Sequence, residues 1–206
     1  MKIYGRANSI NVRKVLWAAD EIGLAYERED WGRGFRPLTD TAFERVSIFR
    51  AIPVVEVDAV LLRESQAIVR YLAARHGRDD IYPTDLAARA RCEAWMDWGA
   101  TDFYENCRPV FHGLVVKNPA YSDPAMLARA IDAWSDHMGM LDQTLAAGGP
   151  YVMGETFTIG DIPVGLVVNR WFSIPFERPE FPAVSAYYDR LAERPAYRRH
   201  GRNGTP

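Results

Sequence analysis

Residues 4–15 read YGRANSINVRKV and mark the point where a short strand gives way to a helix. The apolar residues before Gly5 predict a strand over residues 2–4, and Gly5 ends it. From Val12 onward the spacing of apolar residues predicts an amphipathic helix that stops at Gly23. Its apolar face would carry Val12, Val15, Leu16, Ala19 and Ile22. Arg13, Lys14, Asp20 and Glu21 fall on the opposite face.

Three small polar residues, Asn8, Ser9 and Asn11, lie at the entrance of this helix. A helix N-terminus presents unpaired N–H groups and a partial positive charge, so it favours anions. A thiolate, the reactive form of a thiol, would be stabilised there. The same residues also suit a simple helix cap. This stretch alone therefore leaves a thiolate site and a structural cap both open.

The composition of the 206-residue chain argues against several classes of protein. Its 25 basic and 27 acidic residues give a net charge of -2, so we expect no nucleic-acid partner. The sequence shows neither a signal peptide nor an apolar run of membrane-spanning length, which predicts a cytoplasmic protein without a membrane partner. Cys92 and Cys107 form no CxxC pair, so a disulfide framework is not expected. We expect no metal site, because the histidines lack ligand spacing: His76, His112, His137 and His200.

Periodicity and turn signals divide the chain into an α/β part and an all-helical part. The first part predicts the order β-α-β-α-β-β-α. We expect an N-terminal domain over residues 1–77, a linker rich in aspartate over 78–85, and a helical domain over 86–206. Pro109 should bend or split the first long helix of the second domain. Residues 201–206 are expected to form a mobile tail.

A capping signature lies in the helical part, at residues 157–162. Thr158 is placed to cap a helix, with Asp161 three residues later as its partner. Phe157 and Ile162 are placed to form the hydrophobic staple that brackets such a cap.

With these elements in place, the chain resembles the cytosolic glutathione transferase family over nearly its full length. The resemblance implies a thioredoxin-like N-terminal domain, a helical C-terminal domain and usually a homodimer. Serine-type bacterial enzymes fit better than cysteine-type ones, because no cysteine lies near Ser9. Four stretches carry the match: Ser9 to Val15, Ile52-Pro53, Glu64 to Ile68, and Thr158 to Asp161.

The resemblance implies a role for each matching residue toward glutathione. Ser65 would hold the γ-glutamyl carboxylate, and Glu64 would attract the ammonium group, although both residues also suit an ordinary helix start. A cis Ile52-Pro53 bond would turn the Ile52 backbone outward to pair with the cysteinyl peptide. Relatives often carry an Asn-Pro pair and a polar residue just before this proline. Residues 47–53 read SIFRAIP here, so Arg50 is the remaining candidate for the glycyl end.

Ser9 or Asn11 would donate a hydrogen bond to the glutathione sulfur. A free thiol has a pKa of about 8.5, and each unit of depression requires about 1.4 kcal/mol of thiolate stabilisation. One charge-assisted hydrogen bond contributes about 1.5–3 kcal/mol, so a strong base is not required. The electrophile pocket is expected on the first long helix after the linker, at Tyr104, Arg108 and Phe111. The other aromatic residues of that helix are expected in the core: Trp95, Trp98 and Phe103.

The sequence therefore predicts a glutathione transferase that ionises bound glutathione, its co-substrate, and adds the thiolate to a small apolar electrophile. Peroxide reduction, double-bond isomerisation and dehalogenation use the same thiolate and stay open. A non-catalytic relative that serves as a protein-interaction scaffold is a further alternative, favoured by the altered residues before Pro53. The presence of Ser9, Asn11, Glu64 and Ser65 favours the enzyme.

Overall fold

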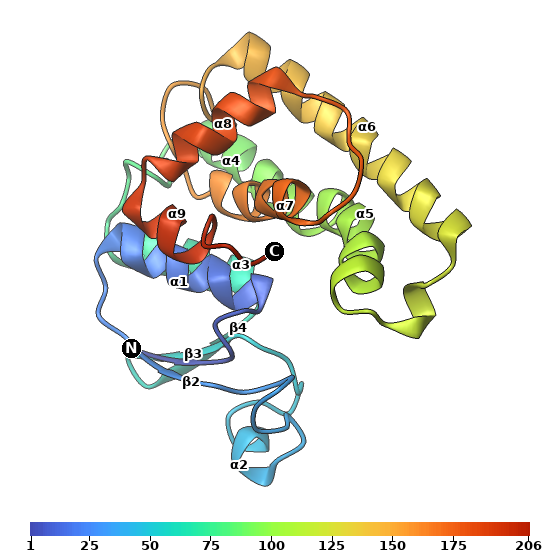
Figure 1. Cartoon of the computed structure of the whole chain (residues 1–206). Coiled ribbons are helices and arrows are strands. Elements are labelled where there is room, and N and C mark those ends of the chain that lie inside the picture. The colour runs from blue at the N-terminus through green and yellow to red at the C-terminus, as the bar shows by residue number, and fades with distance from the viewer. The chain divides into compact units, whose positions relative to one another are not determined.

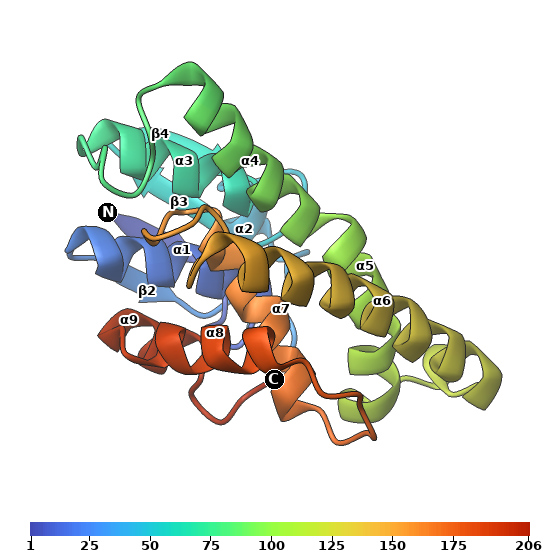
Figure 2. The same ribbon diagram turned by 90° about the horizontal axis from the view of Figure 1, so that it is seen from above.

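The computed structural model describes all residues from 1 to 206, and the chain folds as two compact units. The first unit covers Met1–Asp79 and the second covers Asp80–Pro206. Figures 1 and 2 show that strands occur in the first unit and that the second is built from helices.

The first unit is a four-stranded sheet in the order β2-β1-β3-β4. Strand β1 runs parallel to β2 and antiparallel to β3, and β3 runs antiparallel to β4. Helices α1 and α3 pack against each other on one face of the sheet (Figure 1). The predicted order β-α-β-α-β-β-α is confirmed. Its elements are β1 (Lys2–Tyr4), α1 (Ile10–Ile22), β2 (Glu27–Glu29), α2 (Thr41–Glu44), β3 (Val54–Val57), β4 (Val60–Arg63) and α3 (Ser65–Arg75).

The β3–β4 hairpin fixes which residues lie beside the start of β3. Asp58 and Ala59 form its turn with φ of 51° and 62°, the left-handed backbone that a two-residue hairpin requires. The resulting register pairs Val54 with Arg63. Pro53, which precedes β3, therefore lies close to the end of β4 and the first turn of α3.

Helix α1 begins two residues earlier than the sequence pattern predicts. Gly23 ends it with φ of 82°, and its N–H bonds the carbonyl oxygen of Asp20. Arg13 and Lys14 lie away from the apolar face, yet each is only 2% exposed. The Lys14 ammonium donates to Asn11 Oδ1 at 3.1 Å, so part of its hydrogen-bonding capacity is satisfied within the helix.

The second unit is organised around helix α7 (Asp161–Ser173), which packs against α4, α5 and α8 (Figure 2). Every residue from Asp161 to Trp171 is buried. A helix that is apolar around most of its circumference is typical of a core position. The remaining elements are α4 (Leu86–Ala100), α5 (Asp102–Val110), a π-helical segment (Phe111–Val115), a 3₁₀ turn (Pro119–Tyr121), α6 (Pro124–Gly148), α8 (Pro182–Ala192) and α9 (Pro195–His200).

The break in the first long helix lies at Thr101 and not at Pro109. The Thr101 backbone leaves the helical region, with φ of -108° and ψ of -102°. Pro109 lies inside α5, and the helix widens into a π-helical segment from Phe111, where the Val116 N–H bonds the Phe111 carbonyl oxygen at 3.1 Å. A π turn is one way in which a helix accommodates a local irregularity.

The C-terminal tail, for which the sequence predicts mobility, makes specific contacts in the structure. Asn169, which is 1% exposed, donates from its amide to the Thr205 carbonyl oxygen at 2.9 Å. Gly201 is buried against the Tyr197 ring, where a Cβ atom would lie only 2.1 Å from the ring. These contacts anchor residues that the sequence pattern alone leaves free.

The capping signature before α7 works mainly through Asp161. Its Oδ2 accepts from the Thr158 backbone N–H at 2.8 Å and from the Thr158 hydroxyl at 3.3 Å. Its Oδ1 accepts from the Val152 N–H at 3.0 Å and from the Tyr187 hydroxyl at 3.1 Å. The partnership of Thr158 and Asp161 is confirmed. The expected cap is wrong in one respect, because the Thr158 hydroxyl donates to Asp161 and accepts no bond from the helix N–H groups.

The chain contains no helix with both the length and the apolar composition needed to cross a membrane.

Candidate functional site

A cavity of about 90 Å³ in the first unit brings together three segments that are far apart in the sequence. They are the start of α1, the residues before β3, and the junction between β4 and α3. The sequence-predicted residues Asn11, Ile52-Pro53 and Glu64-Ser65 all line it. Ser9 and Arg50 are not among its lining residues, which are Asn11, Ser47, Phe49, Ala51, Ile52, Pro53, Arg63, Glu64 and Ser65.

The junction between β4 and α3 presents polar groups to this cavity. Ser65 is the first residue of α3 and is 7% exposed, and its hydroxyl bonds no other residue of the chain. Glu64 adopts φ of 65° and ψ of 111°, a conformation that non-glycine residues rarely hold. Such outliers concentrate at binding sites, where the surrounding structure enforces them. The N-terminus of α3 therefore offers a hydroxyl and helix N–H groups to an anion.

The Ile52-Pro53 peptide bond is cis, as the resemblance predicts. Pro53 is buried directly before β3, and Ile52 is half-buried at the cavity wall. The backbone of this segment thus lies at the edge of the β3–β4 hairpin and faces the cavity.

Ser9 and Asn11 both keep a donor available at the start of α1. Ser9 holds the N-cap position, but its side chain makes no capping hydrogen bond. Asn11 uses its amide oxygen to accept from Lys14, which leaves its NH₂ group without a partner in the chain. The capping alternative is therefore not realised by either side chain, and both remain able to donate to a ligand.

Arg50 and Arg63 differ in their relation to the cavity. The Arg50 guanidinium donates to Glu44 Oε1 from Nε at 3.0 Å and from Nη2 at 2.5 Å, outside the cavity lining. Arg63 does line the cavity, with its guanidinium carbon 3.9 Å from the centre of the Phe49 ring. Sequence reasoning missed Arg63. The hairpin register would have revealed it, because a two-residue turn at 58–59 places residue 63 opposite residue 54.

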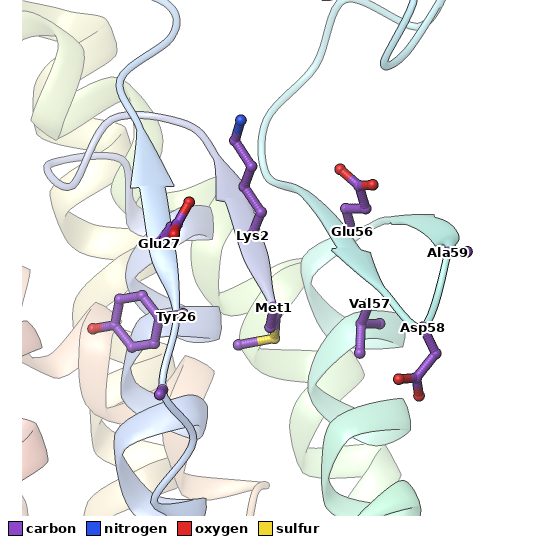
Figure 3. Close-up of a pocket in the computed structure, with 9 residues that line it drawn as sticks. Met1, Lys2, Tyr26, Glu27, Glu56, Val57, Asp58 and Ala59 are labelled. Carbon is purple, nitrogen blue, oxygen red and sulfur yellow. The ribbon is translucent and has the colours of Figure 1, made fainter.

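A larger cavity of about 620 Å³ lies at the opposite end of the same sheet (Figure 3). It is bounded by the first residues of β1 and β2 and by the end of β3, and it contains Glu27, Glu56 and Asp58. Figure 3 shows that Glu56 and Asp58 point in opposite directions and not toward one point. Glu56 accepts from the Tyr4 hydroxyl, and Asp58 forms an ion pair with Arg75 at 3.2 Å. Lys2 and the N-terminal Met1 also line this cavity, so its charges are mixed. None of the sequence-predicted site residues lines it, so the smaller cavity beside Pro53 is the better candidate.

In the second unit, the predicted pocket residues Tyr104, Arg108 and Phe111 are all half-buried. Arg170 of α7 lies against two of them, with its guanidinium carbon 3.8 Å from the Phe111 ring centre and 5.6 Å from that of Tyr104. Sequence reasoning missed Arg170, which lies in an apolar helix and carries no local signal.

The other aromatic residues of this region lie apart from Arg170. Phe103 is fully buried, as predicted, and stacks on Trp98 with ring centres 4.3 Å apart. Trp95 and Trp98 instead line an apolar cavity of about 280 Å³ between α4 and α6, together with the exposed Met140. No three His, Cys, Asp or Glu side chains are grouped so that they could hold a metal ion.

Comparisons with known proteins agree with this fold. A family model described as "Glutathione S-transferase, N-terminal domain" matches residues 3–80. Glutathione S-transferase GstB of Escherichia coli is 33% identical, over 96% of this chain and 95% of its own. The theta class glutathione S-transferase of Xanthomonas axonopodis pv. citri, solved with glutathione bound, is 40% identical with a TM-score of 0.90, over 97% of this chain and 95% of that one.

Two more distant relatives share the fold or part of the sequence. Glutathione transferase F7 from Populus trichocarpa is 21% identical with a TM-score of 0.84, which supports the fold. A probable elongation factor 1-gamma of Arabidopsis thaliana is 26% identical over 91% of this chain, which spans 45% of that protein. The predicted thioredoxin-like domain followed by a helical domain is confirmed, and the chain belongs to the glutathione S-transferase family.

Proposed function

We propose that the protein binds glutathione in the cavity beside Pro53, ionises its thiol and transfers the thiolate to a small electrophile. The observation that carries this proposal is the convergence of Asn11, Ile52-Pro53 and Glu64-Ser65 on one cavity. The glutathione-bound structure of the 40% identical relative supports it.

The carboxylates, the ammonium group and the cysteinyl peptide of glutathione can each be matched with a complementary group at this cavity. The Ser65 hydroxyl and the N-terminus of α3 suit the γ-glutamyl carboxylate, and the Glu64 carboxylate suits the ammonium group. The Ile52 backbone suits the cysteinyl peptide. Arg63 lines the cavity and pairs with Glu64 at 3.3 Å, so it is a cation candidate for a glutathione carboxylate, whereas Arg50 pairs with Glu44 outside the cavity lining.

Thiol activation requires a hydrogen-bond donor for the sulfur. We assign this role to Ser9, because its hydroxyl is free of any capping bond at the positive end of α1. The Asn11 amide lines the cavity and is the second candidate. Either donor, with the helix N-terminus, supplies the few kcal/mol (about 1.5–3 for one charge-assisted bond) that place the thiol pKa near neutrality.

The reaction then needs only the thiolate and a positioned electrophile. The sulfur forms a bond to the electrophilic carbon, and the leaving group departs with its electron pair or a double bond is saturated. Peroxide reduction, isomerisation and dehalogenation begin from the same thiolate.

A homodimer is part of this proposal. Large apolar side chains are exposed in both units, and Ile48, Phe49 and Leu61 are grouped around one hollow, a feature that can mark a protein interface. The exposed side chains are Phe35, Ile48, Phe49, Val60, Leu61, Leu86 and Met140. Cys92 and Cys107 are buried and form no disulfide, which suits a reducing, cytoplasmic environment.

A non-catalytic scaffold is the second candidate, favoured by the altered residues before Pro53, where 47–53 read SIFRAIP. Thermal unfolding with and without glutathione separates the two. A ligand that binds only the native state stabilises it by RT ln(1 + [L]/Kd), or about 2.7 kcal/mol at a hundredfold excess over Kd. We expect millimolar glutathione to raise the Tm, and Ser65→Ala to reduce this rise. An unchanged Tm in the wild-type protein would rule out the enzyme.

A further inference from the structure

Arg170 is a buried cation without an anionic partner. Its side chain comes from α7 in the core of the second unit and is 3% exposed. Nη1 points to the Cys107 sulfur at 3.8 Å, and the Phe111 and Tyr104 rings flank the guanidinium. No Asp or Glu side chain forms an ion pair with it. Charges in protein interiors are normally paired, so the position calls for an anion.

The unsatisfied edge of the Arg170 guanidinium has a defined shape. Nε is buried and makes no hydrogen bond, and the guanidinium's hydrogen bond to Cys107 comes from Nη1, so Nη2 is not used in it. Nε and Nη2 together form the side of the guanidinium that binds a carboxylate by donating two parallel hydrogen bonds to it. A buried N–H without a partner is rare in proteins and is often explained by a missing ligand, ion or water.

A second unsatisfied guanidinium donor lies on the neighbouring helix. Arg108 pairs with Glu105 through Nη2 at 2.9 Å, but its buried Nε has no partner. Arg108 lies between Tyr104 and Phe111 along α5 and the π-helical segment, one turn from each, and these are the rings that flank Arg170. Arg108 therefore shares one side of this helical stretch with the two rings that contact Arg170.

We propose that this region, built on Arg170, Arg108, Tyr104 and Phe111, binds an organic carboxylate, and that the electrophile of the transfer reaction carries this group. The second clause rests on the function proposed above. The rings of Tyr104 and Phe111 suit an aromatic or unsaturated part of the ligand, and the Nε–Nη2 side of the Arg170 guanidinium suits its carboxylate. This narrows the sequence-based expectation of an apolar electrophile to an amphipathic, anionic one.

A matched pair of aryl fluorides tests the charge preference. 4-Fluoro-3-nitrobenzoate and 4-fluoro-3-nitrobenzamide react alike: the thiolate forms a C–S bond at the fluorinated carbon, the C–F bond breaks, and fluoride leaves with the electron pair. The measurement is kcat/KM for each compound at saturating glutathione. The variants are Arg170→Gln, Arg170→Lys and, as a control for net charge, Arg190→Gln, whose exposed guanidinium pairs with Glu193.

We expect Arg170→Gln to lower the benzoate-to-benzamide ratio of kcat/KM at least tenfold, mainly through KM. Arg170→Lys should give an intermediate ratio, because a lysine keeps the charge and loses the two-pronged geometry. Arg190→Gln should leave the ratio within twofold of the wild type. An Arg170→Gln ratio equal to that of the wild type would overturn the proposal, whether or not both rates fall.

Two further measurements on the wild-type protein keep the site testable if the variant does not fold or if no turnover occurs. 3-Nitrobenzoate should bind at least tenfold more tightly than 3-nitrobenzamide in a calorimetric titration without glutathione. Equal affinity, or no binding of either, would overturn the carboxylate site. If glutathione does not raise the Tm of the wild-type protein but 3-nitrobenzoate still binds more tightly than 3-nitrobenzamide, only the transferase function is refuted.

Discussion

Asp161 gives the fold a pH dependence that can be worked out from its surroundings. Asp161 is the first residue of α7, and its completely buried carboxylate accepts four hydrogen bonds, from Val152, Thr158 (two) and Tyr187. Burial raises its pKa from the ordinary value of 3.8 to about 6, although these hydrogen bonds oppose the rise. The native state therefore holds a proton that the unfolded chain has already released between these two values.

The sign of the effect follows from this difference in proton binding. A raised native pKa contributes stability that is fully present below pH 3.8 and is lost as the pH rises through about 6. The whole difference corresponds to about 3 kcal/mol, at 1.36 kcal/mol for each pKa unit. Between pH 4.5 and pH 7, Asp161 should account for about 2 kcal/mol of the fall in unfolding free energy.

The variant Asp161→Asn isolates this contribution, because asparagine has the same size and does not titrate. Urea unfolding of both proteins from pH 4.5 to pH 7 measures the free-energy difference at each pH. We expect the variant to be less stable throughout, at about 1–3 kcal/mol, since its NH₂ group faces the backbone N–H of Val152 or Thr158 and leaves that donor without an acceptor. We also expect the wild type to lose about 2 kcal/mol of its advantage as the pH rises. A difference that stays constant, or that grows with pH, would refute the raised pKa.

Three further variants probe the cap and the cavity. Thr158→Ala should lower the unfolding free energy by about 0.5–1.5 kcal/mol in the same urea assay, since it removes one long hydrogen bond to Asp161 and leaves the backbone bond in place, and calorimetry should show unchanged glutathione affinity. Arg63→Ala should weaken glutathione binding about tenfold in calorimetry, the loss of one charge-assisted contact, and full affinity would remove Arg63 from the site. Ser9→Ala should raise the pKa of bound glutathione by about one to two pH units, with a smaller rise for Asn11→Ala, and the reverse order in a thiolate absorbance titration would exchange their roles.

Local patterns were enough to predict the architecture of the first unit. Apolar alternation, Gly5, Gly23 and the turn at 58–59 each act within a few residues, so their effect can be read in sequence order. The residues at Ile52-Pro53 and Glu64-Ser65 were predicted through the resemblance, and the hairpin brings both segments to one cavity. The roles of Ser9, Asn11 and Arg50 toward glutathione stay predictions.

The features that sequence reasoning missed depend on contacts between distant residues. Arg63 enters the cavity only because the hairpin register places it opposite Val54. Arg170 lies within an apolar helix, and its two aromatic neighbours come from a segment about sixty residues earlier. The tail is held by Asn169, whose amide reaches the Thr205 carbonyl. The position of Arg63 follows from the turn at 58–59, but no periodicity or propensity carries information about the contacts of Arg170 and Asn169.

The central claim, that the cavity beside Pro53 binds glutathione and ionises it, is tested most directly by the ultraviolet titration of the wild-type complex. The thiolate absorbance of protein-bound glutathione is recorded against pH, with free glutathione as the reference. The proposed site predicts that the pKa of the bound thiol lies at least one unit below the free value of about 8.5. A titration that coincides with that of free glutathione, at concentrations where calorimetry shows the ligand bound, would contradict it.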